Sequence, residues 1–182
     1  MLDWFKNLFN KKKNIEQPSI SYSPNTKEFE IIKSKHPEAK ILLLMDDFKE
    51  IVDTLSENLL ETNKFNIYKS WGSFAVFIVQ EWCNDVVFDY AIIDLTLGGI
   101  IMNDNKLDEL DGTDIYILIK KSNPKSKIKF LINDNLNITN EEFNNLKDKF
   151  FRYTNKDITD YCISKLDPQR MDKIKNFLDL KE

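Results

Sequence analysis

The chain has 182 residues, of which 42% are hydrophobic and 31% are charged, and its formal net charge is −4. This length is enough for one domain with a full hydrophobic core and some additional segments. The slight negative charge argues against general nucleic-acid binding, which usually shows a basic surplus. No apolar run is long enough to cross a bilayer, and no signal peptide is recognisable.

The cysteine and histidine content bounds the chemistry further. Two cysteines, Cys83 and Cys162, lie far apart without metal-ligand spacing, which indicates reduced thiols in a cytosolic protein. The single histidine, His36, lies in a polar segment, so neither a histidine-based metal site nor a catalytic triad can be built. The sequence therefore predicts a cytoplasmic protein.

The first 13 residues have the pattern of a short amphipathic helix with a basic end. Its apolar face would consist of Met1, Leu2, Trp4, Phe5, Leu8 and Phe9, and the basic residues that follow are Lys11, Lys12 and Lys13. Such a helix can lie at an anionic membrane surface, such as the inner face of the cell membrane, or dock on a protein partner or on its own domain. Residues 14–38 are polar, contain two prolines, and are predicted to be a linker.

From residue 39 to residue 182 the chain alternates between predicted strands and predicted helices. Strands are expected at 40–45, 65–70, 90–95, 127–133 and 150–153, and helices at 49–63, 112–122, 139–150 and 167–180. Residues 73–83 are expected to form an apolar helix or a buried segment. This alternation predicts an α/β domain: a doubly wound, five-stranded parallel sheet with helices on both faces.

Carboxylates stand at the ends of two of these strands. Asp46 and Asp47 close the first strand, and Asp94 closes the third. In such a sheet the functional groups gather outside the carboxyl ends of the strands. If these strands are neighbours, three carboxylates converge, and a hard cation with oxygen ligands such as Mg²⁺ would offset their repulsion. The alternative is that these acids are unrelated residues at the starts of loops.

Five motifs resemble, in order, those of the receiver domains of two-component response regulators. They are "ILLLMDDF", "AIIDLTL", "LDGTDIYILIKKSNP", "KFLIND" and "RYTNK". The resemblance covers residues 39–182 and implies the flavodoxin-like receiver fold, here as a stand-alone receiver. It also implies that Asp94 accepts a phosphoryl group from a histidine kinase or a phosphotransfer protein, and that the domain then controls a protein target.

The resemblance further implies roles for the residues around Asp94. Mg²⁺ would be bound by Asp47 directly, by Asp46 through water, by Asp94 itself and by the backbone carbonyl of Thr96. Lys156 would pair with the phosphoryl oxygens. Carboxylate attack on phosphorus, with a metal ion and an ammonium group neutralising the oxygens, is chemically consistent with these residue types.

The sequence departs from the family pattern at the residues that respond to phosphorylation. Tyr153 would be the aromatic switch residue. However, Ile132 occupies the position where the family has a hydroxyl-bearing Thr or Ser. Lys156 is followed by Asp157 instead of proline, and the predicted loop 95–112 after Asp94 is about ten residues longer than usual.

The sequence is compatible with three functions. The first is a phosphorylatable receiver tethered through its N-terminal helix, whose enzymatic activity would be at most self-phosphorylation and dephosphorylation. The second is a pseudo-receiver that takes no phosphate and acts as a scaffold or adaptor. The third is an aspartyl-phosphate hydrolase, which is disfavoured because Thr96 stands where such enzymes need a second acid.

Overall fold

The computed structural model describes residues 28–72, 75–103, 106–125, 127–134 and 140–180. The amphipathic helix expected at residues 1–13 lies outside these ranges. Within them, no helix is both long and apolar enough to cross a membrane.

The central sheet has six strands in the order β1-β3-β2-β4-β7-β8. Its strands are β1 (Phe29–Ile32), β2 (Lys40–Asp46), β3 (Phe65–Trp71), β4 (Tyr90–Ile93), β7 (Lys129–Asp134) and β8 (Cys162–Ser164). The last five strands are parallel, as predicted, whereas β1 pairs antiparallel with β3 and forms one edge. The sheet therefore begins inside the segment that was predicted to be a linker.

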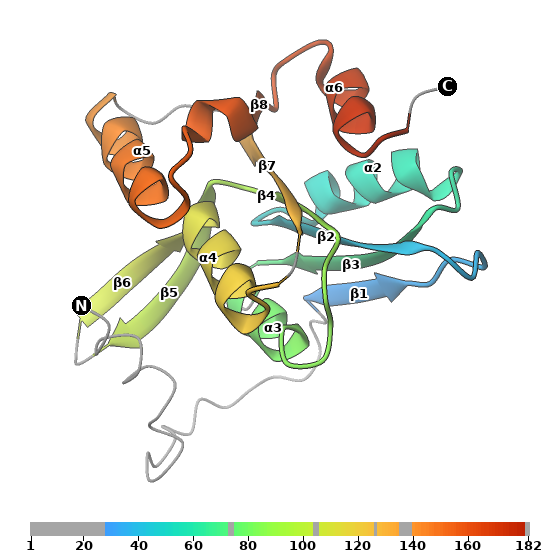
Figure 1. The fold of residues 1–182 in the computed structure, drawn as a ribbon, viewed down its shortest axis with the longest axis horizontal. Coiled ribbons are helices and arrows are strands. Elements are labelled where there is room, and N and C mark those ends of the chain that lie inside the picture. The colour runs from blue at the N-terminus through green and yellow to red at the C-terminus, as the bar shows by residue number, and fades with distance from the viewer. Residues whose placement is uncertain (1–27, 73–74, 104–105, 126, 135–139, 181–182) are drawn as a thin grey trace, which may run out of the picture.

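Helices cover both faces of the sheet, which explains why the central strands are apolar throughout. Figure 1 shows α2 (Lys49–Leu60) and α6 (Arg170–Phe177) on one side, and α3 (Ala75–Trp82) and α4 (Gly112–Ser122) on the other. α5 (Asn140–Thr154) contributes Phe150 to the core that α3 and α4 share. Alternate residues of β2 accordingly enter different cores: Leu43 and Met45 face α3 and α4, and Leu42 and Leu44 face α2 and α6.

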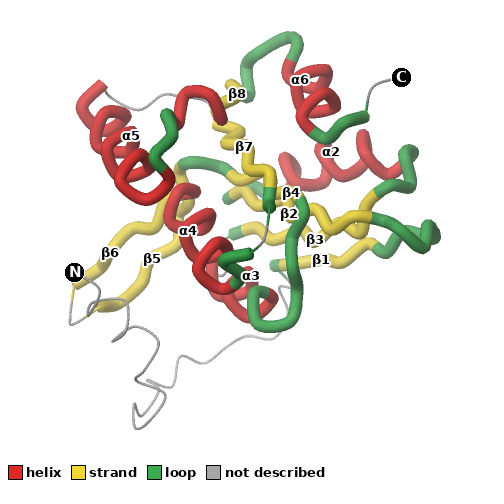
Figure 2. Tube along the Cα trace, viewed as in Figure 1, coloured by secondary structure: helices red, strands yellow, loops and turns green. Residues whose placement is uncertain are grey.

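The long segment after Asp94 is a β-hairpin rather than a loop. β5 (Thr96–Asn103) pairs antiparallel with β6 (Lys106–Asp111) in a separate two-stranded sheet, which extends away from the central sheet (Figure 2). The pairing runs from Asn103 opposite Lys106 to Thr96 opposite Asp111, so both ends of the hairpin meet next to Asp94.

The strand predicted at residues 150–153 is wrong, because these residues form the last part of α5. Phe150 is buried, whereas Phe151 and Tyr153 are about half exposed, which is the one-sided burial of a helix. A short 3-10 helix, η1 (Ile158–Tyr161), follows and leads directly into β8. The final strand of the sheet is therefore Cys162–Ser164.

Candidate functional site

The register of the sheet brings two predicted acids and an asparagine together. Ile93 of β4 is paired with Met45 of β2 on one side and with Ile132 of β7 on the other. The residues that follow these three are Asp46, Asp94 and Asn133, so they lie side by side at the carboxyl edge of the sheet. All three are buried, with 2%, 4% and 1% of their surface exposed, respectively.

A lysine connects the two carboxylates. Lys165 directly follows β8, and its Nζ lies 2.8 Å from Asp46 Oδ2 and 2.9 Å from Asp94 Oδ2. Its backbone N–H donates a 2.8 Å hydrogen bond to the carbonyl oxygen of Asp134, the last residue of β7. Burial lowers the pKa of the Lys165 ammonium, but the two carboxylates outweigh this effect, and the pKa is raised. Lys165 is therefore held in its charged form.

The second oxygen of each carboxylate accepts a backbone hydrogen bond. Asp46 Oδ1 accepts from the N–H of Phe48 at 3.1 Å, and Asp94 Oδ1 accepts from the N–H of Leu95 at 3.0 Å. Burial, followed by the charge of Asp46, raises the pKa of Asp94 to about 7, although Lys165 opposes both effects. Negative charge on Asp94 is thus unfavourable in this site, so additional positive charge would stabilise it.

The hairpin returns to the sheet directly beside Asp94. The N–H of Gly112 donates a 2.9 Å hydrogen bond to the carbonyl oxygen of Leu95. A Cβ atom at position 112 would lie 2.3 Å from the carbonyl oxygen of Asp94. Only glycine allows this close approach, and this explains the glycine at the first position of α4.

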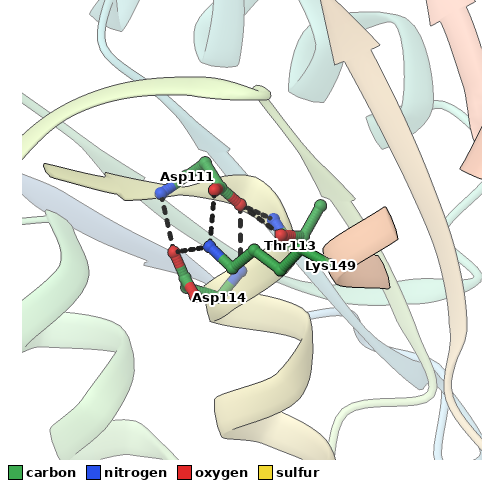
Figure 3. A network of polar contacts seen from close by, with 4 residues as sticks. All are labelled: Asp111, Thr113, Asp114 and Lys149. Atoms are coloured by element: carbon green, nitrogen blue, oxygen red, sulfur yellow. Dashed lines mark hydrogen bonds and ion pairs between the residues drawn. The ribbon is translucent and has the colours of Figure 1, made fainter. Parts of the chain in front are cut away.

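A separate polar network anchors the end of the hairpin to α4 and α5 (Figure 3). The Asp111 carboxylate caps α4 by accepting from the N–H groups of Thr113 and Asp114, and Asp114 Oδ2 accepts from the N–H of Asp111. Lys149 of α5 places its Nζ 2.7 Å from Asp111 Oδ2 and 2.6 Å from Asp114 Oδ2. Asp111 and Asp114 therefore hold the end of the hairpin to α4 and α5, and they are not part of the cluster at Asp94.

The structure places the predicted metal ligands as follows. Asp46 and Asp94 lie together, Asp47 is partly buried next to Asp46, and Thr96 is exposed at the start of β5. The Thr96 hydroxyl lies 3.5 Å from Asp134 Oδ2. The donors are hard oxygens, which Mg²⁺ prefers. Among the described residues, however, no group of three or more acids, histidines or cysteines has the arrangement of a metal site.

Two other predicted residues are not brought to this cluster. Lys156 follows α5, and its Nζ lies 5.4 Å from the centre of the Tyr161 ring. Tyr153 is 50% exposed on α5, with Lys121 Nζ 5.3 Å from its ring. Ile132 is fully buried in the core on the α3 and α4 side, and its hydrocarbon side chain has no hydrogen-bond donor for Asp94.

Two residues of the site were missed from the sequence. The motif "RYTNK" resembles the last strand with its lysine, whereas the structure has the strand and Lys165 in "CISK". Arg170 at the start of α6 was assigned no role, yet its guanidinium interacts electrostatically with both Asp46 and Asp94. The available signal was the lysine that directly follows the short β-branched and apolar stretch before the closing helix.

No protein-family model matches the chain, and no curated protein matches it. Several solved structures share its fold. A response regulator receiver protein from Sinorhizobium medicae is 14% identical, with a TM-score of 0.50 and coverage of 79% of this chain and 94% of that chain. A CheY-like receiver domain protein from Methanospirillum hungatei is 20% identical, with a TM-score of 0.50 and coverage of 78% and 95%.

A third structure, the RcsB response regulator of Salmonella typhimurium, is 13% identical, with a TM-score of 0.50. That match covers 80% of this chain and 61% of the RcsB chain. At such low identities the agreement concerns the arrangement of strands and helices. The chain therefore has the receiver fold of response regulators.

Proposed function

We propose that this chain is a receiver-type signalling protein in which Asp94 accepts a phosphoryl group from a phosphohistidine of a kinase or phosphotransfer protein. The observation that carries this proposal is the contact of Lys165 with both Asp94 and Asp46 at the carboxyl edge of the sheet. This arrangement supplies a carboxylate nucleophile and a fixed cation within one hydrogen bond of each other. Lys165 takes the role that the sequence resemblance had assigned to Lys156.

In the proposed reaction a carboxylate oxygen of Asp94 attacks the phosphorus atom, the phosphorus–nitrogen bond of the donor breaks, and the imidazole leaves with a proton. The Lys165 ammonium stabilises the negative charge on the phosphoryl oxygens. Bound Mg²⁺ would supply further neutralisation of this charge. Asp46, Asp47, Asp94 and the carbonyl of Thr96 would hold it.

The test is phosphorylation of the purified protein by acetyl phosphate in the presence of Mg²⁺, followed by intact mass spectrometry. We expect one added phosphoryl group in the wild type and none in Asp94→Ala. A wild-type mass that stays unchanged, in protein shown to be folded, would refute the proposal.

The second candidate is a phosphorylation-independent adaptor. It is favoured by Ile132, which cannot supply the hydroxyl through which receivers sense the phosphoryl group. In that case the β5–β6 hairpin beside Asp94 would serve as a partner-binding surface. Target binding that is equal for wild type and Asp94→Ala, with and without acetyl phosphate, would identify this function.

The tether is a further part of the proposal. The apolar and lysine residues within positions 1–13 would attach the protein to an anionic membrane or to a larger assembly. Co-sedimentation with vesicles containing anionic lipid, compared with neutral vesicles, tests the membrane option. Loss of binding in a Trp4→Ser, Phe5→Ser variant is the expected result.

A further inference from the structure

Arg170 lies on the same face of the sheet as the acidic site. Leu44, Ile92 and Leu131 are paired across β2, β4 and β7 and pack in one core with Ile174 and Leu178 of the α6 segment. Side chains alternate along a strand, so residues two positions further on lie on the same face. Those residues are Asp46, Asp94 and Asn133, and α6 therefore begins above them.

Two of the three guanidinium nitrogens of Arg170 are buried without a hydrogen-bond partner. Its Nε and Nη2 atoms are inaccessible to solvent, and neither forms a hydrogen bond. Lys165 is the cation that contacts Asp46 and Asp94, and within the described part of the chain Arg170 makes no ion pair. Both carboxylates nevertheless act on it electrostatically, opposing the burial that lowers the pKa of Arg170.

Asn133 is the second buried group without a partner. It is 1% exposed, and its Oδ1 accepts no hydrogen bond. A buried acceptor and two buried guanidinium nitrogens without partners on one face of the sheet are each unfavourable, so their retention indicates a ligand that completes the site. A guanidinium offers a planar fork of donors that matches the oxygens of a phosphoryl group.

We propose that Arg170 binds the phosphoryl oxygens on Asp94, and that Asn133 Oδ1 accepts a hydrogen bond from the same guanidinium and orients it. This inference rests on the proposed function. Arg170 would donate to the phosphoryl group the hydrogen bonds that the side chain of Ile132 cannot. Arg170 is the first residue of α6, so phosphorylation would be sensed by α6 rather than by an aromatic side chain.

Beryllofluoride binding to the full chain with Mg²⁺ tests the proposal directly. Trp71 is paired with Asp46 across β2 and β3, so its fluorescence can report binding. Arg170→Gln is expected to weaken binding by roughly 10- to 100-fold, the effect of losing hydrogen bonds between charged groups. Lys173→Gln removes the same charge from an exposed position of α6 and should leave the affinity within about twofold.

Two further variants separate the charge of Arg170 from the geometry of its hydrogen bonds. Asn133→Ala should lower beryllofluoride affinity less than Arg170→Gln does, because the guanidinium remains. Arg170→Lys, which keeps the charge but loses the fork, should give an intermediate affinity. A cooperative thermal transition in each variant verifies folding before the affinities are compared.

Free inorganic phosphate separates this inference from the proposed function. If acetyl phosphate labels the wild type but Arg170→Gln binds beryllofluoride equally well, the inference is wrong and the proposed function stands. If the wild type is not labelled, thermal stabilisation by inorganic phosphate decides: stabilisation lost in Arg170→Gln and retained in Lys173→Gln supports an oxyanion site for free phosphate. Equal stabilisation in all three proteins overturns the inference.

Discussion

At the scale of single residues, the charge balance around Asp94 determines what the site can do. Asp46 and Asp94 are two buried carboxylates, and the single ammonium group of Lys165 contacts both and offsets one of their two negative charges. Removing one member of a buried ion pair leaves an uncompensated charge, which costs more than the pair itself contributes. Lys165 is therefore expected to affect both stability and phosphoryl transfer.

Lys165→Gln should lower the free energy of unfolding by about 2 to 4 kcal/mol without Mg²⁺, and it should strongly slow labelling of Asp94 by acetyl phosphate. Urea denaturation and intact mass measure the two effects. Lys156→Gln is the matched control, since Lys156 is exposed and contacts the Tyr161 ring. Slower labelling in the control than in Lys165→Gln would restore Lys156 as the functional lysine.

A second prediction concerns the pH dependence of stability without metal. The pKa of Asp94 is about 7 in the folded protein, above its ordinary value of 3.8, so the folded state binds the proton more tightly. Asp94 therefore lowers stability progressively as the pH rises from about 4 to about 7, and the loss is complete above pH 7. An asparagine at position 94 does not ionise. The free energy of unfolding of Asp94→Asn should therefore rise, relative to that of the wild type, by about 2 to 4 kcal/mol from pH 5 to pH 8.

Denaturation in EDTA at both pH values measures this gain. Asp172→Asn, an exposed substitution on α6, serves as the control and should show no comparable gain. A difference between Asp94→Asn and wild type that is independent of pH would contradict the prediction.

At the scale of elements, the hairpin changes the surroundings of the site. β5 and β6 begin and end beside Asp94, because Thr96 is opposite Asp111 and a Cβ atom at Gly112 would clash with the Asp94 carbonyl. The hairpin is anchored by Lys149, which joins α5 to the capping residues of α4 (Figure 3). α4, α5 and the hairpin are thus connected through polar contacts close to the sheet edge.

Gly112→Ala tests the close approach of α4 to Asp94. The added methyl group would lie 2.3 Å from the Asp94 carbonyl oxygen, so the backbone at the site must shift. We expect a stability loss of about 1 to 3 kcal/mol, the usual range for overpacking, together with slower phosphorylation. Thermal denaturation and intact mass measure these effects, and a variant unchanged in both would contradict the contact.

Lys149→Ala tests the anchor of the hairpin. Burial, and then the charge of Asp111, raise the pKa of Asp114, and Lys149 opposes this rise. Its removal should cost about 1 to 3 kcal/mol at pH 7, and less at acidic pH, where Asp114 becomes protonated. Lys147, also on α5, forms a more exposed 3.4 Å pair with Asp157, so Lys147→Ala should cost under about 1 kcal/mol. Equal losses in urea denaturation would contradict the prediction.

At the scale of the whole molecule, the proposed metal ion should couple to global stability. A ligand that binds only the folded state stabilises it by an amount that grows with the logarithm of its concentration. We expect Mg²⁺ to raise the melting temperature of the wild type in a concentration-dependent way, and to have much less effect on Asp47→Asn. Asp85→Asn, in the turn that follows α3, is the control and should respond like the wild type. A melting temperature independent of Mg²⁺ would argue against the metal site.

The sequence by itself determined the alternation of strands and helices and the position of the acids at strand ends. Both are local properties: a continuous apolar run indicates a buried strand, and a polar residue at its end marks the edge of the sheet. The parallel sheet with helices on both faces, and the proximity of Asp46 to Asp94, followed from these patterns and are confirmed.

Only the tertiary structure decided which residues complete the site. β8 has three residues, and its strand conformation depends on pairing with β7, so no local pattern distinguished it from residues 150–153. Lys165 contacts Asp94 because of that pairing, and Arg170 lies within electrostatic range of Asp94 because α6 packs over the same face of the sheet. Both residues are more than 70 positions from Asp94 in the sequence. The energy that places them comes from packing between elements, which the sequence pattern of each element does not contain.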